Sequence, residues 1–115
     1  MTFARVVFVI AGAFGAIACV GLYFAPGSPT YYGLIAGVVA WQVAFFIIAS
    51  DPGRYRPLMI PAVVEKMVWV LTLAVLYTRG AMTTRAMASG IIPHGLLGLL
   101  FVAAFVRTPR NGDDT

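Results

Sequence analysis

Charged residues make up only 10% of this 115-residue chain, whereas 61% of its residues are apolar and its mean hydropathy is +0.92. Soluble domains carry about 25% charged residues, and disordered chains are poor in apolar residues, so the composition excludes both classes. A helix needs roughly 20 apolar residues to cross a bilayer. The sequence therefore predicts an all-α polytopic membrane protein, one domain over residues 1–115 that forms an up-down-up-down bundle of four transmembrane helices.

Reactive and metal-binding side chains are equally scarce, with one cysteine, Cys19, one histidine, His94, and four acids. A single cysteine forms no intramolecular disulfide and builds no thiolate zinc site. The chain has no glycine-rich phosphate loop and no serine or cysteine placed beside a base. We therefore expect no catalytic residue, no metal and no cofactor.

Four apolar runs divide the chain, and a polar tail follows them at residues 107–115. The predicted spans lie at about residues 3–24, 30–50, 57–77 and 87–106. Prolines and glycines fill the breaks at residues 26–29 and 51–57, where a helix cannot continue. Thr30 is the expected N-cap of the second span.

The first run has a second interpretation as a signal peptide, because Arg5 precedes its apolar core and the residues before Cys19 resemble a bacterial lipoprotein cleavage box. Such a box normally carries a larger aliphatic residue where Ala16 stands. The apolar run also continues to Phe24 instead of turning polar. Both features favour a span over a cleaved leader.

Arginines at the span ends predict the orientation, because positive residues are enriched on the cytoplasmic side. On a four-crossing path five arginines share the side of the termini and two share the other. They are Arg5, Arg54, Arg56, Arg107 and Arg110 against Arg79 and Arg85. We expect a multi-pass protein of the inner (plasma) membrane with both termini cytoplasmic. Its partner is the lipid bilayer, and no basic face remains for nucleic acid.

Small residues provide surfaces for helix packing, which inside a bilayer depends on close contact rather than on hydrophobic burial. Gly33 and Gly37 form a GxxxG pair in the second span. Further small residues are Ala11, Gly12, Gly15 and Ala16 in the first span and Gly90, Gly95 and Gly98 in the fourth. They serve either packing within the chain or a seam with a second copy or a membrane partner protein.

Polar residues inside the spans are the informative positions, since a charge near the bilayer centre costs about 2.5 kcal/mol or more and persists only with a partner or a role. Helix rise places Gln42 and Glu65 level, roughly 12 Å from the inner face, and Thr72 and His94 roughly 20 Å from it. These depths predict two polar layers. Lys66 lies beside Glu65 in the chain.

Helical periodicity places four residues of the third span on one stripe. They are Pro61, Glu65, Trp69 and Thr72. Lys66 is turned about 100° away, so we expect no pairing of Glu65 with Lys66 within the helix. The lysine is expected to reach the inner headgroups or Asp51 instead.

Two interpretations of Glu65 remain open. It forms a hydrogen bond to Gln42 or Trp41 and only sets the helix register, or it binds a proton or a cationic or polar ligand in a cavity, with His94 as a second titrating group. The segment at residues 51–57 has a similar choice. Either Asp51 caps the turn or pairs with Arg54 or Arg56, or these arginines bind an anionic lipid headgroup.

The stretch DPGRYRP at residues 51–57, followed by Glu65 and Lys66, resembles small four-span bacterial inner-membrane proteins, loosely the DoxX-like class. The resemblance covers the whole chain in hydropathy but only residues 51–66 in recognisable positions. It implies a bacterial four-helix bundle and supplies no activity and no functional residue. Small multidrug-resistance transporters have a similar length, but their essential glutamate lies in the first span, where this chain has no acid.

The sequence therefore predicts a non-enzymatic inner-membrane bundle, either an accessory or interaction protein or a lipid-binding one. The alternative is a small proton-coupled transporter or carrier that uses Glu65. Candidate ligand- or proton-binding residues are Gln42, Glu65, Lys66, Trp69, Thr72 and His94.

Overall fold

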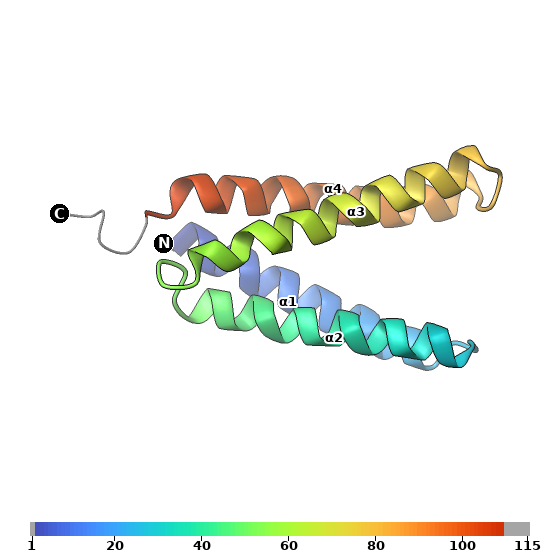
Figure 1. Ribbon diagram of the computed structural model, residues 1–115, viewed down its shortest axis with the longest axis horizontal. Coiled ribbons are helices and arrows are strands. Elements are labelled where there is room, and N and C mark those ends of the chain that lie inside the picture. The colour runs from blue at the N-terminus through green and yellow to red at the C-terminus, as the bar shows by residue number, and fades with distance from the viewer. Residues whose placement is uncertain (1, 110–115) are drawn as a thin grey trace.

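The computed structural model describes residues 2–109 and confirms an all-α bundle of four helices, each long and apolar enough to cross a membrane (Figure 1). The helices are α1 (Thr2–Tyr23), α2 (Pro29–Ser50), α3 (Met59–Thr78) and α4 (Thr84–Arg107). A short 3₁₀ turn, η1 (Arg56–Leu58), leads into α3. The predicted tail from residue 110 onward lies outside the described residues.

Hydroxyl caps set where two of the helices begin. The side chain of Ser28 accepts a hydrogen bond from a first-turn N–H of α2, so the N-cap is Ser28 and not Thr30. The side chain of Thr83 caps α4 in the same way, which starts that helix before the predicted Met87. The turn between α3 and α4 contains Gly80 at φ 73°, a left-handed conformation that favours glycine.

The helices form two antiparallel hairpins, because α1 packs along α2 and α3 packs along α4. Between the hairpins, α1 meets α4 over a shorter length and α2 meets α3 only narrowly. Figure 1 shows the hairpins close together at the end that holds residues 51–57 and both ends of the described chain. They diverge toward the loops at residues 24–28 and 79–83, which gives the bundle a V shape.

The buried core lies at the closed end of the V. Its centre is an aromatic cluster of Phe8 in α1, Phe45 in α2 and Phe101 in α4, each 0% exposed. The rings of Phe8 and Phe101 stack with centroids 4.5 Å apart, and Phe45 meets Phe101 edge-on at 5.1 Å. Buried Met59 at the start of α3 completes the core. Three helices thus share one packed contact that joins the two hairpins.

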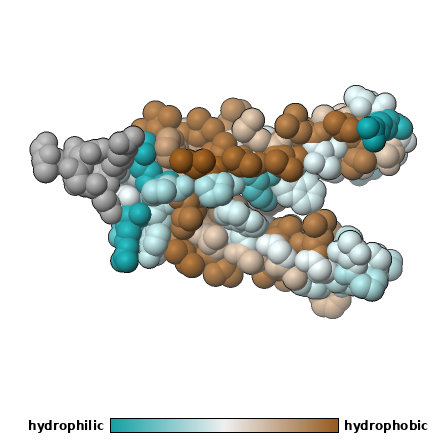
Figure 2. All heavy atoms as spheres, viewed as in Figure 1, coloured by the Kyte–Doolittle hydropathy of each residue, from teal (hydrophilic) through white to brown (hydrophobic). Residues whose placement is uncertain are grey.

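The outer surface is apolar on all four helices, as expected of spans that face lipid tails. Figure 2 shows hydrophobic residues over both arms of the V, hydrophilic residues gathered near the two ends, and a notch between the arms at the loop end. The arginines follow the predicted division. Arg5, Arg54, Arg56 and Arg107 belong to the closed end and Arg79 and Arg85 to the loop end, while Arg110 lies outside the described residues.

Candidate functional site

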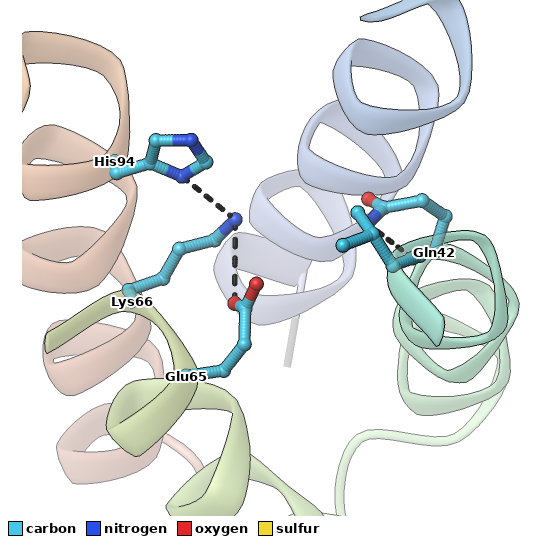
Figure 3. A network of polar contacts seen from close by, with 5 residues as sticks. Gln42, Glu65, Lys66 and His94 are labelled. Atoms are coloured by element: carbon cyan, nitrogen blue, oxygen red, sulfur yellow. Dashed lines mark hydrogen bonds and ion pairs between the residues drawn. The ribbon is translucent and has the colours of Figure 1, made fainter. Parts of the chain in front are cut away.

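Lys66 is the most deeply buried charged group described in residues 2–109, with only 4% of its side chain exposed. Its ammonium lies 3.4 Å from Glu65 Oε2 and 3.3 Å from His94 Nδ1 (Figure 3). The same ammonium is 5.4 Å from the ring centroid of Phe45. The three polar groups thus form one connected cluster, and the contact to His94 joins α3 to α4.

The expectation that Glu65 and Lys66 do not pair within their helix is wrong. Their backbone positions do point about 100° apart, but the flexible four-carbon stem of lysine lets the ammonium swing back to its neighbour. In an apolar interior that contact offsets part of the cost of burying the charge. Within residues 2–109 Lys66 forms its ion pair with Glu65 and not with Asp51. Asp51 instead has the alternative predicted role of a cap, because it is the C-cap residue of α2 and its Oδ1 accepts a hydrogen bond from the backbone N–H of Arg54.

His94 joins the Lys66 level of the bundle instead of forming a separate layer with Thr72. Its ring stacks on Trp69 with centroids 5.0 Å apart and planes 4° apart. The predicted distance of His94 from the loop end was too short, because α4 begins at Thr84 and not at Met87. Three more residues of helix place His94 about 4.5 Å deeper from the loop end.

Gln42 lies across the bundle from this cluster and is 3% exposed. Its Nε2 donates to the carbonyl of Val38 at 2.8 Å, so its amide bonds its own helix and not Glu65, for which Gln42 was one of two predicted partners. Within residues 2–109 its Oε1 is buried without a hydrogen-bond partner. That oxygen packs against Gly15 of α1, where an added methyl group would overlap it.

A lateral groove of about 640 Å³ separates α2 from α3. We define it by Gly37, Val38 and Trp41 of α2 together with Glu65, Trp69 and Thr72 of α3, and its walls are almost wholly apolar. Pro61 lines it as well, so all four residues of the predicted stripe face one space. The groove opens where the two hairpins fail to meet.

A central cavity of about 300 Å³ lies among all four helices. Its lining includes Gly15 and Cys19 of α1, Gln42 of α2, Lys66 of α3 and His94 of α4. Sequence reasoning missed the contribution of α1. The spacing of four residues between Gly15 and Cys19, which puts them on one helical face, is the signal that was available for it.

Three side chains line both spaces and therefore form the wall between them: Leu34, Val38 and Trp69. Glu65 faces the lateral groove, whereas its partner Lys66 faces the central cavity. Both volumes fall within or near the range of small-molecule sites, about 300 to 1,000 Å³. The polar cluster thus sits at the boundary between the two compartments.

The two arginines of the segment at residues 51–57 have different surroundings. The Nε of Arg56 donates to the backbone carbonyls of Phe105 at 3.2 Å and Thr108 at 2.7 Å, and its guanidinium lies 3.8 Å from the ring centroid of Phe105. Arg56 therefore ties η1 to the end of α4. Arg54 is exposed and lies 5.4 Å from the Tyr55 ring centroid, and its binding of a lipid headgroup stays a prediction.

Comparisons with protein families, curated proteins and solved structures find no match for this chain. The resemblance to DoxX-like proteins therefore stays a prediction. Within residues 2–109 no three histidine, cysteine or acidic side chains lie close enough to hold one metal ion. The lateral groove and the central cavity are the features from which function is argued.

Proposed function

We propose that this chain is a non-enzymatic multi-pass protein of the bacterial inner membrane that binds a lipid molecule in the lateral groove. The observation that carries the proposal is the groove itself, an apolar space of about 640 Å³ between two helices that both face the lipid phase. An acyl chain enters such a groove sideways from the bilayer without crossing water. The two termini lie in the cytoplasm in this proposal, because arginines are concentrated at the closed end.

The rim of the groove supports entry from the bilayer. Leu34, Val64 and Val68 line it and are also among the strongly exposed apolar side chains of the chain. An unfilled groove leaves these walls without dispersion contacts, which adjoining helices make elsewhere in the bundle. A lipid chain supplies those contacts.

The two tryptophans of the chain allow a direct test, because Trp41 and Trp69 both line the groove. Purified protein in detergent is titrated with a phospholipid that carries brominated acyl chains, and quenching of tryptophan fluorescence is followed. We expect saturable quenching, because a chain in the groove brings bromine to both rings. Quenching that rises linearly without saturation refutes the proposal.

Gly37 and Gly33 provide a blocking variant and its matched control. An added Cβ meets no atom within 4 Å at either position, but only Gly37 lines the groove. A leucine at position 37 displaces about two methylenes of the ligand, at ~0.8 kcal/mol each, so Gly37→Leu is expected to weaken binding about tenfold. Gly33→Leu is expected to leave binding unchanged. Equal effects of the two variants contradict the assignment of the groove.

A second candidate function is a proton-coupled carrier that uses Glu65. The observation that favours it is the run of contacts from Glu65 in the groove through Lys66 to His94 in the cavity, which links titratable groups across the wall between the two spaces. Protein reconstituted into liposomes is then expected to move protons or a solute, and Glu65→Gln is expected to abolish that flux. Flux retained in Glu65→Gln rules the carrier out.

A further inference from the structure

We infer that the bound lipid carries an uncharged hydroxyl head, as a monoacylglycerol or a long-chain alcohol does, and that this head lies in the central cavity between Gln42 and Lys66. The inference rests on the proposed function and adds the chemical class of the ligand. Its tail occupies the lateral groove. Its head passes the wall of Leu34, Val38 and Trp69, which the two spaces share.

The orientation of the Gln42 amide favours a ligand that donates a hydrogen bond. Its Nε2 donates to the Val38 carbonyl, and turning the amide over would set two oxygens against each other. The Oε1 therefore lies on the side of the amide away from the Val38 carbonyl. Gln42 is only 3% exposed, and within residues 2–109 no group donates a hydrogen bond to this oxygen. A buried acceptor without a donor is costly, so a ligand that donates a hydrogen bond is favoured here.

A second unpartnered atom indicates the same chemistry. Glu65 Oε2 is buried and lacks a well-aligned hydrogen bond, although the ammonium of Lys66 is 3.4 Å away. Both buried side-chain atoms that lack a hydrogen bond in residues 2–109 are thus acceptors, one on Gln42, which lines the cavity, and one on Glu65, which lines the groove. What these two acceptors lack is a hydrogen-bond donor, which an ester or ether group does not supply.

Charge decides between a hydroxyl head and an ionic one. The contact between Lys66 and Glu65 already balances one positive and one negative group at the site. A carboxylate or an ammonium head adds an uncompensated charge to a site enclosed by apolar helices, which is expensive. An uncharged head adds none.

A hydroxyl also suits the donors that are present. The Lys66 ammonium carries three donors and contacts two groups, Glu65 and His94, which leaves a donor for a further acceptor. A hydroxyl oxygen accepts from that position while its proton is donated to Gln42 Oε1. Figure 3 shows Lys66 and Gln42 on opposite sides of the space between the hairpins, and both line the central cavity.

The experiment compares three probes that share one brominated acyl chain and differ only in the head: a monoacylglycerol, a fatty acid methyl ester and a fatty acid. Binding to the native chain in detergent is measured at neutral pH by quenching of Trp41 and Trp69. We expect the monoacylglycerol to bind about tenfold more tightly than the methyl ester. The ionised fatty acid is expected to bind no better than the ester.

Variants locate the head. Gln42→Leu removes the acceptor and is expected to raise the Kd of the monoacylglycerol about three- to tenfold, with no change for the methyl ester. Ser89→Ala is the matched control, because that hydroxyl also lines the cavity but donates to Ala86 of its own helix. The comparison of the three probes on the native chain holds even where Gln42→Leu does not fold.

The outcomes separate the inference from the proposed function. No saturable quenching by any probe refutes lipid binding in the groove, and the inference with it. Equal Kd values for all three probes leave lipid binding intact and overturn the hydroxyl head. A fatty acid that binds most tightly also overturns it, because it shows that Lys66 serves as the counter-ion of an anionic head.

Discussion

Replacing Lys66 by methionine tests whether the buried polar cluster acts as a unit. The side chain is 4% exposed and touches Glu65 and His94, so Lys66→Met keeps most of the packed volume but removes the shared partner of both groups. Glu65 then stays in the groove wall without its counter-charge. We expect Lys66→Met to destabilise the folded chain.

The magnitude follows from two limits. Removing one partner of a buried ion pair costs about 3 to 5 kcal/mol in soluble proteins, whereas polar contacts between membrane helices average about 0.6 kcal/mol. Glu65 keeps 13% exposure and faces the groove, so its isolation costs less than in a sealed core. We therefore expect a loss of about 2 kcal/mol for Lys66→Met.

A double-mutant cycle separates this contact from unrelated effects of the substitution. Glu65→Gln alone is expected to cost about 1 kcal/mol, since the amide oxygen still accepts from Lys66. The double variant Glu65→Gln/Lys66→Met should cost no more than the larger single change, which gives a coupling energy of at least about 1 kcal/mol.

The assay is reversible unfolding of the purified protein in mixed micelles, followed by helical circular dichroism. Because the four proteins differ at only two positions, they are compared at one detergent composition. If the two single costs add to within about 0.5 kcal/mol, Glu65 and Lys66 do not interact in the folded protein, and the cluster in Figure 3 is refuted.

Two further predictions concern packing and use the same unfolding assay. Gly15→Ala adds a methyl group that overlaps the Gln42 amide and should cost about 1 to 3 kcal/mol, whereas Gly33→Ala extends into open space and should gain about 0.5 to 1 kcal/mol. Phe101→Ala empties the closed end of the V and should cost about 3 kcal/mol or more, whereas Phe24→Ala, 86% exposed, should change stability by less than about 0.5 kcal/mol. Equal effects within either pair contradict the packing described.

Hydropathy and turn residues were sufficient to predict the four helices, because a run of about 20 apolar residues has few stable alternatives in a bilayer. Helix starts were harder. A side-chain hydroxyl fixes them, and two neighbouring candidates such as Ser28 and Thr30 differ only in which one reaches a free N–H. The start of α4 was uncertain in the same way. Because Thr83 caps that helix before the predicted start at Met87, the predicted depth of His94 was in error.

The candidate site was predictable in its backbone geometry but not in its side-chain contacts. Periodicity correctly grouped Glu65, Trp69 and Thr72 on one face, since that depends on helix geometry alone. It failed for Lys66, whose long side chain reaches a partner that its backbone direction does not indicate. Small-residue spacing marked Gly15 as a packing position, but the side chain that it packs against, Gln42 of α2, depends on how the two helices are placed and is not given by the sequence of either one.

The V shape itself follows from where the hairpins are tied to each other. At the closed end the guanidinium of Arg107 in α4 lies 4.3 Å from the ring centroid of Phe3 in α1, and the rings of Phe8 and Phe101 stack between the same two helices.

At the loop end, the tyrosine hydrogen bonds described in residues 2–109 stay within one hairpin. Tyr31 and Tyr32 donate to carbonyls at the end of α1 and in the loop after it, and Tyr77 bonds Thr84.

Each hairpin is therefore held as a unit near its own loop, while the contact between hairpins is concentrated at the opposite end. Separating the loops breaks none of these bonds, because every one of them has both partners in the same hairpin. In the proposed function, the lateral groove widens to admit a lipid chain while the aromatic core at the closed end stays packed. That division of contacts suits a protein that binds a flexible ligand from the bilayer better than one that holds a rigid catalytic geometry.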